Sequence, residues 1–148
     1  MGETMRRALS LCAAILLLAG AGGAAGGDDS LSAADQAAIR AVIESQVEAF
    51  RRDDGVAAFS YAAPMIRQKF GTAETFMSMV RTGYLAVYRP REVTFLEVRV
   101  KGGEVAQAVR FVGPDGATVI AVYLMERQPD GNWRIAGVRL FPIDERGS

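Results

Sequence analysis

The second half of the sequence changes from helical spacing to four segments rich in β-branched and aromatic residues, and this change constrains the fold most. The segments span residues 93–100, 105–112, 117–127 and 133–141. Between them lie Gly102-Gly103, Pro114-Asp115-Gly116 and Pro129-Asp130-Gly131-Asn132. Gly, Asp and Asn accept the positive φ angles that tight hairpin connections need. The sequence therefore predicts an antiparallel meander of four strands.

The residues before this meander show the apolar spacing of helices. The longest expected helix spans residues 30–54, with Ser32 and Asp35 as a capping box at its start. A short helix is expected over residues 56–61, a second one from Pro64 to Gly71, and a third from Thr72 through Val87. Helices followed by an antiparallel meander indicate an α+β domain whose helices cover one face of the sheet.

The third predicted strand is apolar on both of its sides. One side carries Ala121 and Tyr123, and the other carries Ile120, Val122 and Leu124. Helices on one face would leave the second side uncovered, so we expect a homodimer that packs sheet against sheet. The alternative is a strongly curved sheet that buries both of its faces within one chain.

Residues 1–27 have the order of a secretory signal peptide. Arg6 and Arg7 precede the apolar run 8–19, and the small-residue stretch 20–27 leads to Asp28. The apolar run is shorter than the roughly 20 residues that span a bilayer. We expect removal of this segment and a single domain over residues 28–148, periplasmic or secreted, with no membrane span. An uncleaved membrane anchor is the alternative.

Composition excludes several classes of function. The chain has no histidine, which rules out Ser-His-Asp and Cys-His catalysis and His-ligated zinc. Its 17 basic and 17 acidic residues give no basic excess for binding nucleic acid. The single cysteine, Cys12, lies in the signal segment, so the mature domain contains no thiol. We find no metal-ligand spacing and no phosphate-binding glycine loop, and we expect no cofactor.

Several short motifs, taken in this order, resemble an uncharacterised and mostly bacterial family, domain of unknown function 4864. They are Ala34-Asp35-Gln36, Val42-Ile43-Glu44-Ser45-Gln46, Ala58-Phe59-Ser60-Tyr61-Ala62-Ala63-Pro64, Lys69-Phe70-Gly71, Val87-Tyr88-Arg89-Pro90, Gln107-Ala108-Val109 and Asp130-Gly131-Asn132-Trp133-Arg134-Ile135. The resemblance covers residues 30–143. It implies the nuclear transport factor 2-like (cystatin-like) α+β cone, in which a curved sheet wraps a long N-terminal helix around an apolar interior. Related members include isomerases, dehydratases and cyclases, but the resemblance assigns no catalytic residue to this chain.

Four residues are candidates for binding a ligand in such a cone. Tyr84, Tyr88 and Arg89 follow one another near the end of the third short helix, and Arg89 would meet an anionic group. Gln107 lies between alanines in a predicted strand, where its amide would orient a ligand. In the structural alternative, Tyr84 is a core residue, Arg89 pairs with a carboxylate or with helix C-terminal carbonyls, and Gln107 faces solvent. Asp53 and Asp54 are interpreted as turn residues, not as a metal or acid–base site.

Three functions remain open. We favour a non-catalytic binding module whose cone takes a small, mostly apolar ligand or a partner. The second is a small cofactor-free isomerase, dehydratase or cyclase that uses Tyr and carboxylate groups, and the third is a purely structural homodimer. An inward carboxylate within hydrogen-bond reach of a Tyr would favour the enzyme, and a cone filled by side chains would favour the structural dimer.

Overall fold

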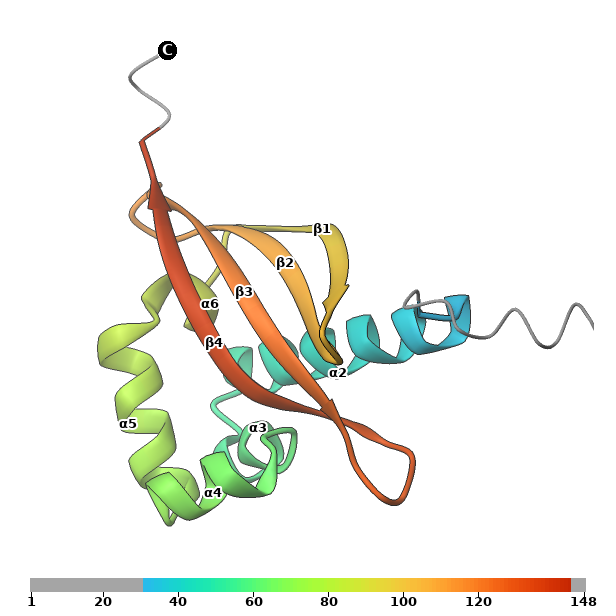
Figure 1. Cartoon of the computed structure of the whole chain (residues 1–148). Coiled ribbons are helices and arrows are strands. Elements are labelled where there is room, and N and C mark those ends of the chain that lie inside the picture. Colours follow the sequence, from blue (N-terminus) through green and yellow to red (C-terminus); the bar gives the residue numbers. More distant parts are fainter. Residues whose placement is uncertain (1–30, 145–148) are drawn as a thin grey trace, which may run out of the picture.

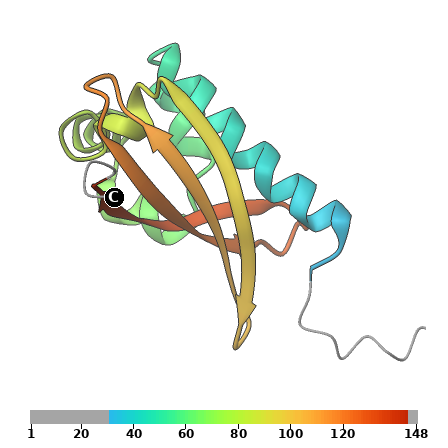
Figure 2. The same ribbon diagram turned by 90° about the horizontal axis from the view of Figure 1, so that it is seen from above.

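A computed structural model of the chain describes residues 31–144, so the predicted signal peptide lies outside the described residues. The domain is α+β, and its elements run from the N-terminal helices to a four-stranded antiparallel sheet in the order β1-β2-β3-β4. The helices gather on one side of the twisted sheet (Figure 1). Seen from above, the long helix α2 lies beside the curved strands and not among them (Figure 2). The predicted α+β meander is confirmed.

The four strands lie close to their predicted ranges. They are β1 (Glu92–Lys101), β2 (Glu104–Val112), β3 (Thr118–Arg127) and β4 (Trp133–Ile143). Gly102 and Gly103, with φ of 57° and 81°, make the tight β1–β2 connection that only residues tolerant of positive φ form readily. The pairing register shifts between Phe95 and Val98 in β1 and after Leu124 in β3. Such irregularities bend a strand and increase its twist.

Helix α2 (Ala33–Arg51) is shorter at both ends than predicted. Ser32 caps it by accepting a hydrogen bond from the Asp35 backbone N–H at 3.0 Å. The Asp35 carboxylate in turn accepts a hydrogen bond from the Ser32 hydroxyl at 2.9 Å. The predicted apolar face is buried at Ile39, Ile43, Val47 and Phe50 and partly buried at Val42.

The short helices are α3 (Gly55–Ser60), α4 (Pro64–Phe70), α5 (Ala73–Gly83) and α6 (Leu85–Tyr88). The prediction of one continuous helix from Thr72 through Val87 is wrong, because the helix breaks at Tyr84. Tyr84 has φ −134° and ψ 44°, outside helical geometry. Its hydroxyl donates to the carbonyl of Val138 in β4, 54 residues away in the sequence. A long-range contact therefore accompanies this break.

Residues 61–63 attach the short helices to the sheet. The Ala63 N–H donates to the Ile135 carbonyl at 2.8 Å, and the Ile135 N–H donates to the Tyr61 carbonyl at 2.9 Å. Ala62 thus forms a parallel bridge with Ile135 at the open edge of β4. This attachment fixes α4 against the start of β4, where α4 forms part of the wall of the interior.

The two faces of the sheet differ in cover. Val109, Phe111, Ala121 and Tyr123 are fully buried against the helices and join one core with α2 and α5. The opposite face, which we call the outer face, carries Ile120, Val122 and Leu124 at intermediate exposure and Phe141 and Ile143 at 50% and 40% exposure. In the described part of the chain, Ile120, Val122 and Leu124 do not pack against the core that the helices form with the inner face.

Candidate functional site

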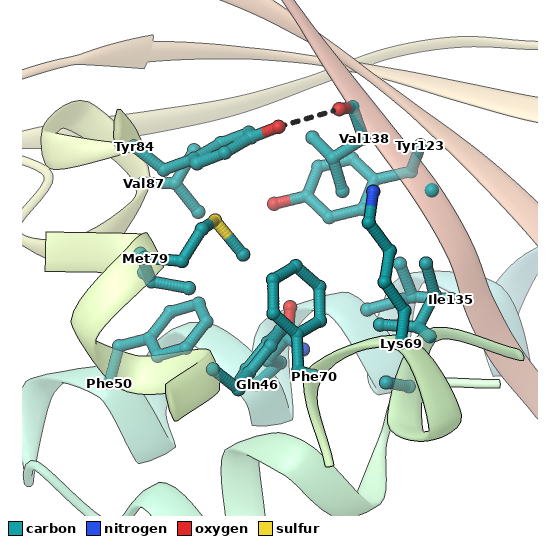
Figure 3. A pocket seen from close by; sticks show the side chains of 15 residues that line it. Gln46, Phe50, Lys69, Phe70, Met79, Tyr84, Val87, Tyr123, Ile135 and Val138 are labelled. Atoms are coloured by element: carbon teal, nitrogen blue, oxygen red, sulfur yellow. Dashed lines mark hydrogen bonds between the residues drawn. The ribbon is translucent and has the colours of Figure 1, made fainter. Parts of the chain in front are cut away.

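An apolar cavity of about 410 Å³ lies between the inner face of the sheet and the helices. Of the five helices in residues 31–144, all but α3 contribute to its wall, together with β3, β4 and the link at Ala62. Its 15 lining residues are Gln46, Phe50, Ala62, Ile66, Lys69, Phe70, Phe76, Met79, Val80, Tyr84, Val87, Tyr123, Ile135, Gly137 and Val138 (Figure 3). Aromatic and aliphatic groups dominate this wall. Cavities of this size and lining are typical of small-molecule sites.

Tyr123 is the polar group buried most deeply in the wall. It stands on β3 with 0% exposure, and its hydroxyl points into the cavity (Figure 3). Among residues 31–144 the hydroxyl has no hydrogen-bond partner. Burial raises the pKa of Tyr123 well above its usual value, so the phenol stays protonated at neutral pH and keeps its O–H donor. A buried hydroxyl without a partner costs about 1–3 kcal/mol.

Tyr84 closes the cavity on the side of α5 and α6. Its ring lines the cavity, and its hydroxyl donates to the Val138 carbonyl at 3.2 Å. Figure 3 shows this bond spanning the top of the cavity. Of the four candidate residues from the sequence, Tyr84 is the one that lines the cavity.

Two further polar side chains belong to the wall. Gln46 is 3% exposed, and its amide Nε2 donates to the Ala58 carbonyl at 3.1 Å, which ties α2 to α3. Lys69, on α4, lines the cavity but is itself exposed, so its amine stands where the cavity meets solvent. The lining residues, all within the described chain, include no Asp or Glu.

Tyr88 and Arg89 lie in a different place, at the C-terminal end of α2. The Tyr88 hydroxyl donates to one oxygen of the Asp53 carboxylate, and the Arg89 guanidinium donates to the other at 2.8 Å. Arg89 also donates to the Phe50 carbonyl and stacks on the Tyr88 ring at 4.0 Å. Arg81 donates to the Tyr88 hydroxyl at 3.4 Å. We call these four residues, Asp53, Arg81, Tyr88 and Arg89, the latch.

The latch has a structural explanation. The α2 C-terminus leaves carbonyls without helical partners, and a cation there is stabilised by them. Asp53 adopts φ 53°, the turn conformation that ends α2. Hydrogen bonding from Tyr88, followed by the charge of Arg89, lowers the pKa of Asp53. The structural alternative stated for Arg89 thus matches the geometry, and so does the turn interpretation of Asp53 and Asp54, since Asp54 caps α3 through the Ala57 N–H.

Gln107 is buried within the sheet and does not line the cavity. Its Nε2 donates to the carbonyls of Leu96 at 3.0 Å and Ala108 at 2.8 Å. Leu96 lies in the irregular part of β1, where the shift of register interrupts the ladder between β1 and β2. The amide of Gln107 therefore supplies a hydrogen bond that the ladder lacks there.

Sequence reasoning missed Tyr123, Gln46 and Lys69. Gln46 carried a signal, because it falls among Ile39, Ile43 and Phe50 at helical spacing and so interrupts an apolar face. Tyr123 was placed on its strand, but nothing in the local sequence says whether its hydroxyl finds a partner. In the sequence Lys69 cannot be distinguished from a solvated lysine on a short helix. Its place in the cavity wall follows only from the position of β3 and β4 relative to α4.

No group of three or more Cys, Asp or Glu side chains in residues 31–144 is arranged to hold a metal ion. The helices within the same range are too short or too polar to cross a membrane.

The fold and the cavity define a small α+β domain with an apolar interior that is open to solvent beside Lys69. Comparison with known families shows which family this domain belongs to. The chain belongs to the family described as domain of unknown function (DUF4864), whose sequence profile matches residues 32–147. The family resemblance seen in the sequence is thereby confirmed. No curated protein and no solved structure matches the chain.

Proposed function

We propose that the domain binds a small, mostly apolar ligand in the cavity and hydrogen-bonds one polar atom of that ligand through Tyr123. The observation that carries this proposal is the fully buried Tyr123 hydroxyl, which faces the cavity without a partner among the described residues. Buried hydroxyls are almost always paired, because an unpaired one destabilises the fold. A ligand acceptor in the cavity would remove that cost, so the same feature that weakens the domain alone would strengthen its complex.

The chemistry of the wall favours binding over catalysis. Our criterion for an enzyme was a carboxylate facing inward beside a tyrosine, which would supply an acid or a base. The lining offers Tyr84, Tyr123, Lys69 and Gln46 as polar groups and no Asp or Glu within the described chain. Tyrosine with an apolar wall provides orientation and affinity, which is what a binding module needs.

We also infer that the fold belongs to the nuclear transport factor 2-like superfamily. Three features support this placement: a long N-terminal helix, shorter helices on the same side, and a curved antiparallel sheet around an apolar cavity. The family to which the chain belongs does not by itself assign a superfamily, so the superfamily is part of this proposal. A solved structure that superposes on known cones would test it, and a flat sheet with a filled interior would contradict it.

Export forms a further part of the proposal. Its support is the order of the first 27 residues, in which a basic start, an apolar run and small residues precede Asp28. Removal of that segment takes Glu3, Arg6 and Arg7 with it and leaves a mature domain of net charge −1 without cysteine. Intact-mass measurement of the protein from the periplasm or medium should give a chain that begins after residue 21 or 25, or near 27. A full-length mass would contradict export with cleavage.

Binding of the uncharged dye Nile red tests the proposed function. Val138→Phe places a larger side chain in the cavity wall, whereas Val56→Phe makes the same change at a position that is 77% exposed on α3. We expect saturable dye fluorescence with the wild-type domain and with Val56→Phe, and loss of this fluorescence with Val138→Phe. The Val138→Phe variant should still unfold cooperatively, as the wild type does. Native mass spectrometry should also detect a co-purified small molecule in the first two proteins. Equal dye binding by all three proteins would contradict a site in this cavity.

The homodimer remains a proposal of its own, supported by the outer face. Phe141 lies opposite Ile120 in the β3–β4 register, and both stand on that face with Val122 and Leu124. An apolar patch without cover is typical of an interface between subunits. Light scattering at micromolar concentration should give twice the chain mass for the wild type and a single chain mass for Val122→Lys. A monomeric wild type would contradict the dimer and leave the cavity proposal intact.

A further inference from the structure

The proposed ligand needs a chemical class, and Lys69 supplies evidence for one. The chain holds one other lysine, Lys101, at the tip of the β1–β2 hairpin and away from the cavity. Lys69 instead extends from α4 toward the wall that carries Tyr123 and Val138 (Figure 3). It is the one cationic side chain among the cavity-lining residues of the described chain.

The amine of Lys69 has no carboxylate partner among residues 31–144. Its one described interaction is with the face of the Phe70 ring, at 5.6 Å from the ring centre. Phe70 also lines the cavity. A cation over an aromatic ring is held there only weakly when it is exposed, so the ammonium group keeps its three hydrogen-bond donors for a further partner. The latch differs in this respect, because Arg89 and Asp53 already satisfy one another.

From these contacts we infer that the ligand is an apolar monocarboxylate whose charged end pairs with Lys69 at the cavity entrance. Its apolar body would pack against Phe50, Phe70 and Phe76, and Tyr123 would donate a hydrogen bond to the same carboxylate that Lys69 pairs with. One lysine balances one negative charge, which fits a carboxylate. A phosphate monoester carries close to two negative charges at pH 7 and would keep an unbalanced charge against an apolar wall. The inference rests on the proposed function, since it names the ligand class of the same cavity.

Two matched ligands isolate the charge. 4-Butylbenzoate and 4-butylbenzamide have nearly the same shape, but only the first is an anion at pH 7. We would titrate each one calorimetrically into the wild type, Lys69→Met and Lys101→Met. The Met side chain keeps the length and apolar stem of lysine, and Lys101→Met removes an equal charge far from the cavity.

The expected result is a change in the preference for the acid over the amide. Lys69→Met should reduce this preference about fivefold, as for an ion pair of about 1 kcal/mol near solvent. Lys101→Met should leave it unchanged, and Lys69→Arg should restore most of it. Raising NaCl to 1 M should shrink the preference of the wild type and leave that of Lys69→Met unaltered, because salt screens a solvent-accessible pair.

The outcomes separate this inference from the proposed function. If both compounds and Nile red bind the wild type but Lys69→Met keeps the wild-type preference, the cavity binds ligands and the carboxylate inference is overturned. If neither compound nor Nile red binds the wild type, the proposed function fails and the inference fails with it. A loss of preference in Lys101→Met equal to that in Lys69→Met would also overturn it, since the effect would then be one of net charge.

Discussion

The hydroxyl of Tyr88 lies at the surface among Asp53, Arg81 and Arg89, whereas the hydroxyl of Tyr123 lies in the interior with no partner in the described chain. Both tyrosines are aromatic residues of the same domain, and both carry one donor and one acceptor. Side chains of the folded chain satisfy the hydroxyl of Tyr88, so no ligand is needed to explain that cluster. No described residue satisfies the hydroxyl of Tyr123. The difference teaches that a polar group left unpaired in an apolar cavity points to a ligand more strongly than a well-connected polar cluster does.

The largest effect on stability is expected at the latch. Arg89→Met removes the hydrogen bonds to the Phe50 carbonyl and the Asp53 carboxylate, so these two acceptors at the end of α2 lose a donor. We expect the free energy of unfolding to fall by about 2 kcal/mol in urea denaturation. Affinity for Nile red should stay at the wild-type value, because Arg89 does not line the cavity. An Arg89→Met variant of normal stability that loses dye binding would contradict the structural role that we assign to the latch and the binding role that we assign to the cavity.

A matched pair of tyrosine variants sharpens the comparison. Tyr123→Phe removes a buried hydroxyl that lacks a partner, so the ligand-free domain should become more stable by about 1 kcal/mol. Tyr88→Phe removes a hydroxyl that bonds Asp53 and Arg81, so that domain should become less stable by a similar amount. Urea denaturation of ligand-free samples measures both changes. Destabilisation by both variants would mean that the Tyr123 hydroxyl has a partner after all.

The smallest effect concerns acid and the Asp53 carboxylate. Hydrogen bonding from Tyr88 lowers the pKa of Asp53 below its ordinary 3.8. The unfolded chain therefore binds more protons than the folded one below about pH 4, and the stability that Asp53 contributes is present above that pH and is lost as the pH falls through the lowered pKa. Asp53→Asn should flatten the dependence of unfolding free energy on pH below about pH 4. An unchanged slope would show that Asp53 has no lowered pKa in the folded state.

The fold could be predicted where its causes are local. Gly102-Gly103 dictates a tight connection, Thr72 and Ser32 dictate helix starts, and apolar spacing dictates the buried face of α2. The break at Tyr84 could not be predicted, because it accompanies a bond to Val138 that exists only after β4 is in place.

The candidate site divides in the same way. The sequence leaves Tyr84 open between the mouth of a pocket and the core, and in the structure its ring lines the cavity. For Gln107 the sequence leaves open a ligand contact or a solvent-facing position, whereas in the structure its amide is buried and bonded to the irregular part of β1. That irregularity is a property of two paired strands and has no signature in either one. The role of Tyr123 depends on the absence of a hydrogen-bond partner for its hydroxyl within the described chain. That absence can be recognised only when α2, α5, α6 and β4 are all in place around the cavity.

The most direct test of the central claim is the affinity of Tyr123→Phe for 4-butylbenzamide, measured by calorimetry beside the wild type. This ligand is uncharged, so the result does not depend on Lys69. The account predicts that the variant, although at least as stable as the wild type, binds about fivefold more weakly, as expected for the loss of one hydrogen bond of about 1 kcal/mol. Equal affinity in a folded Tyr123→Phe variant would contradict the claim that this hydroxyl binds the ligand.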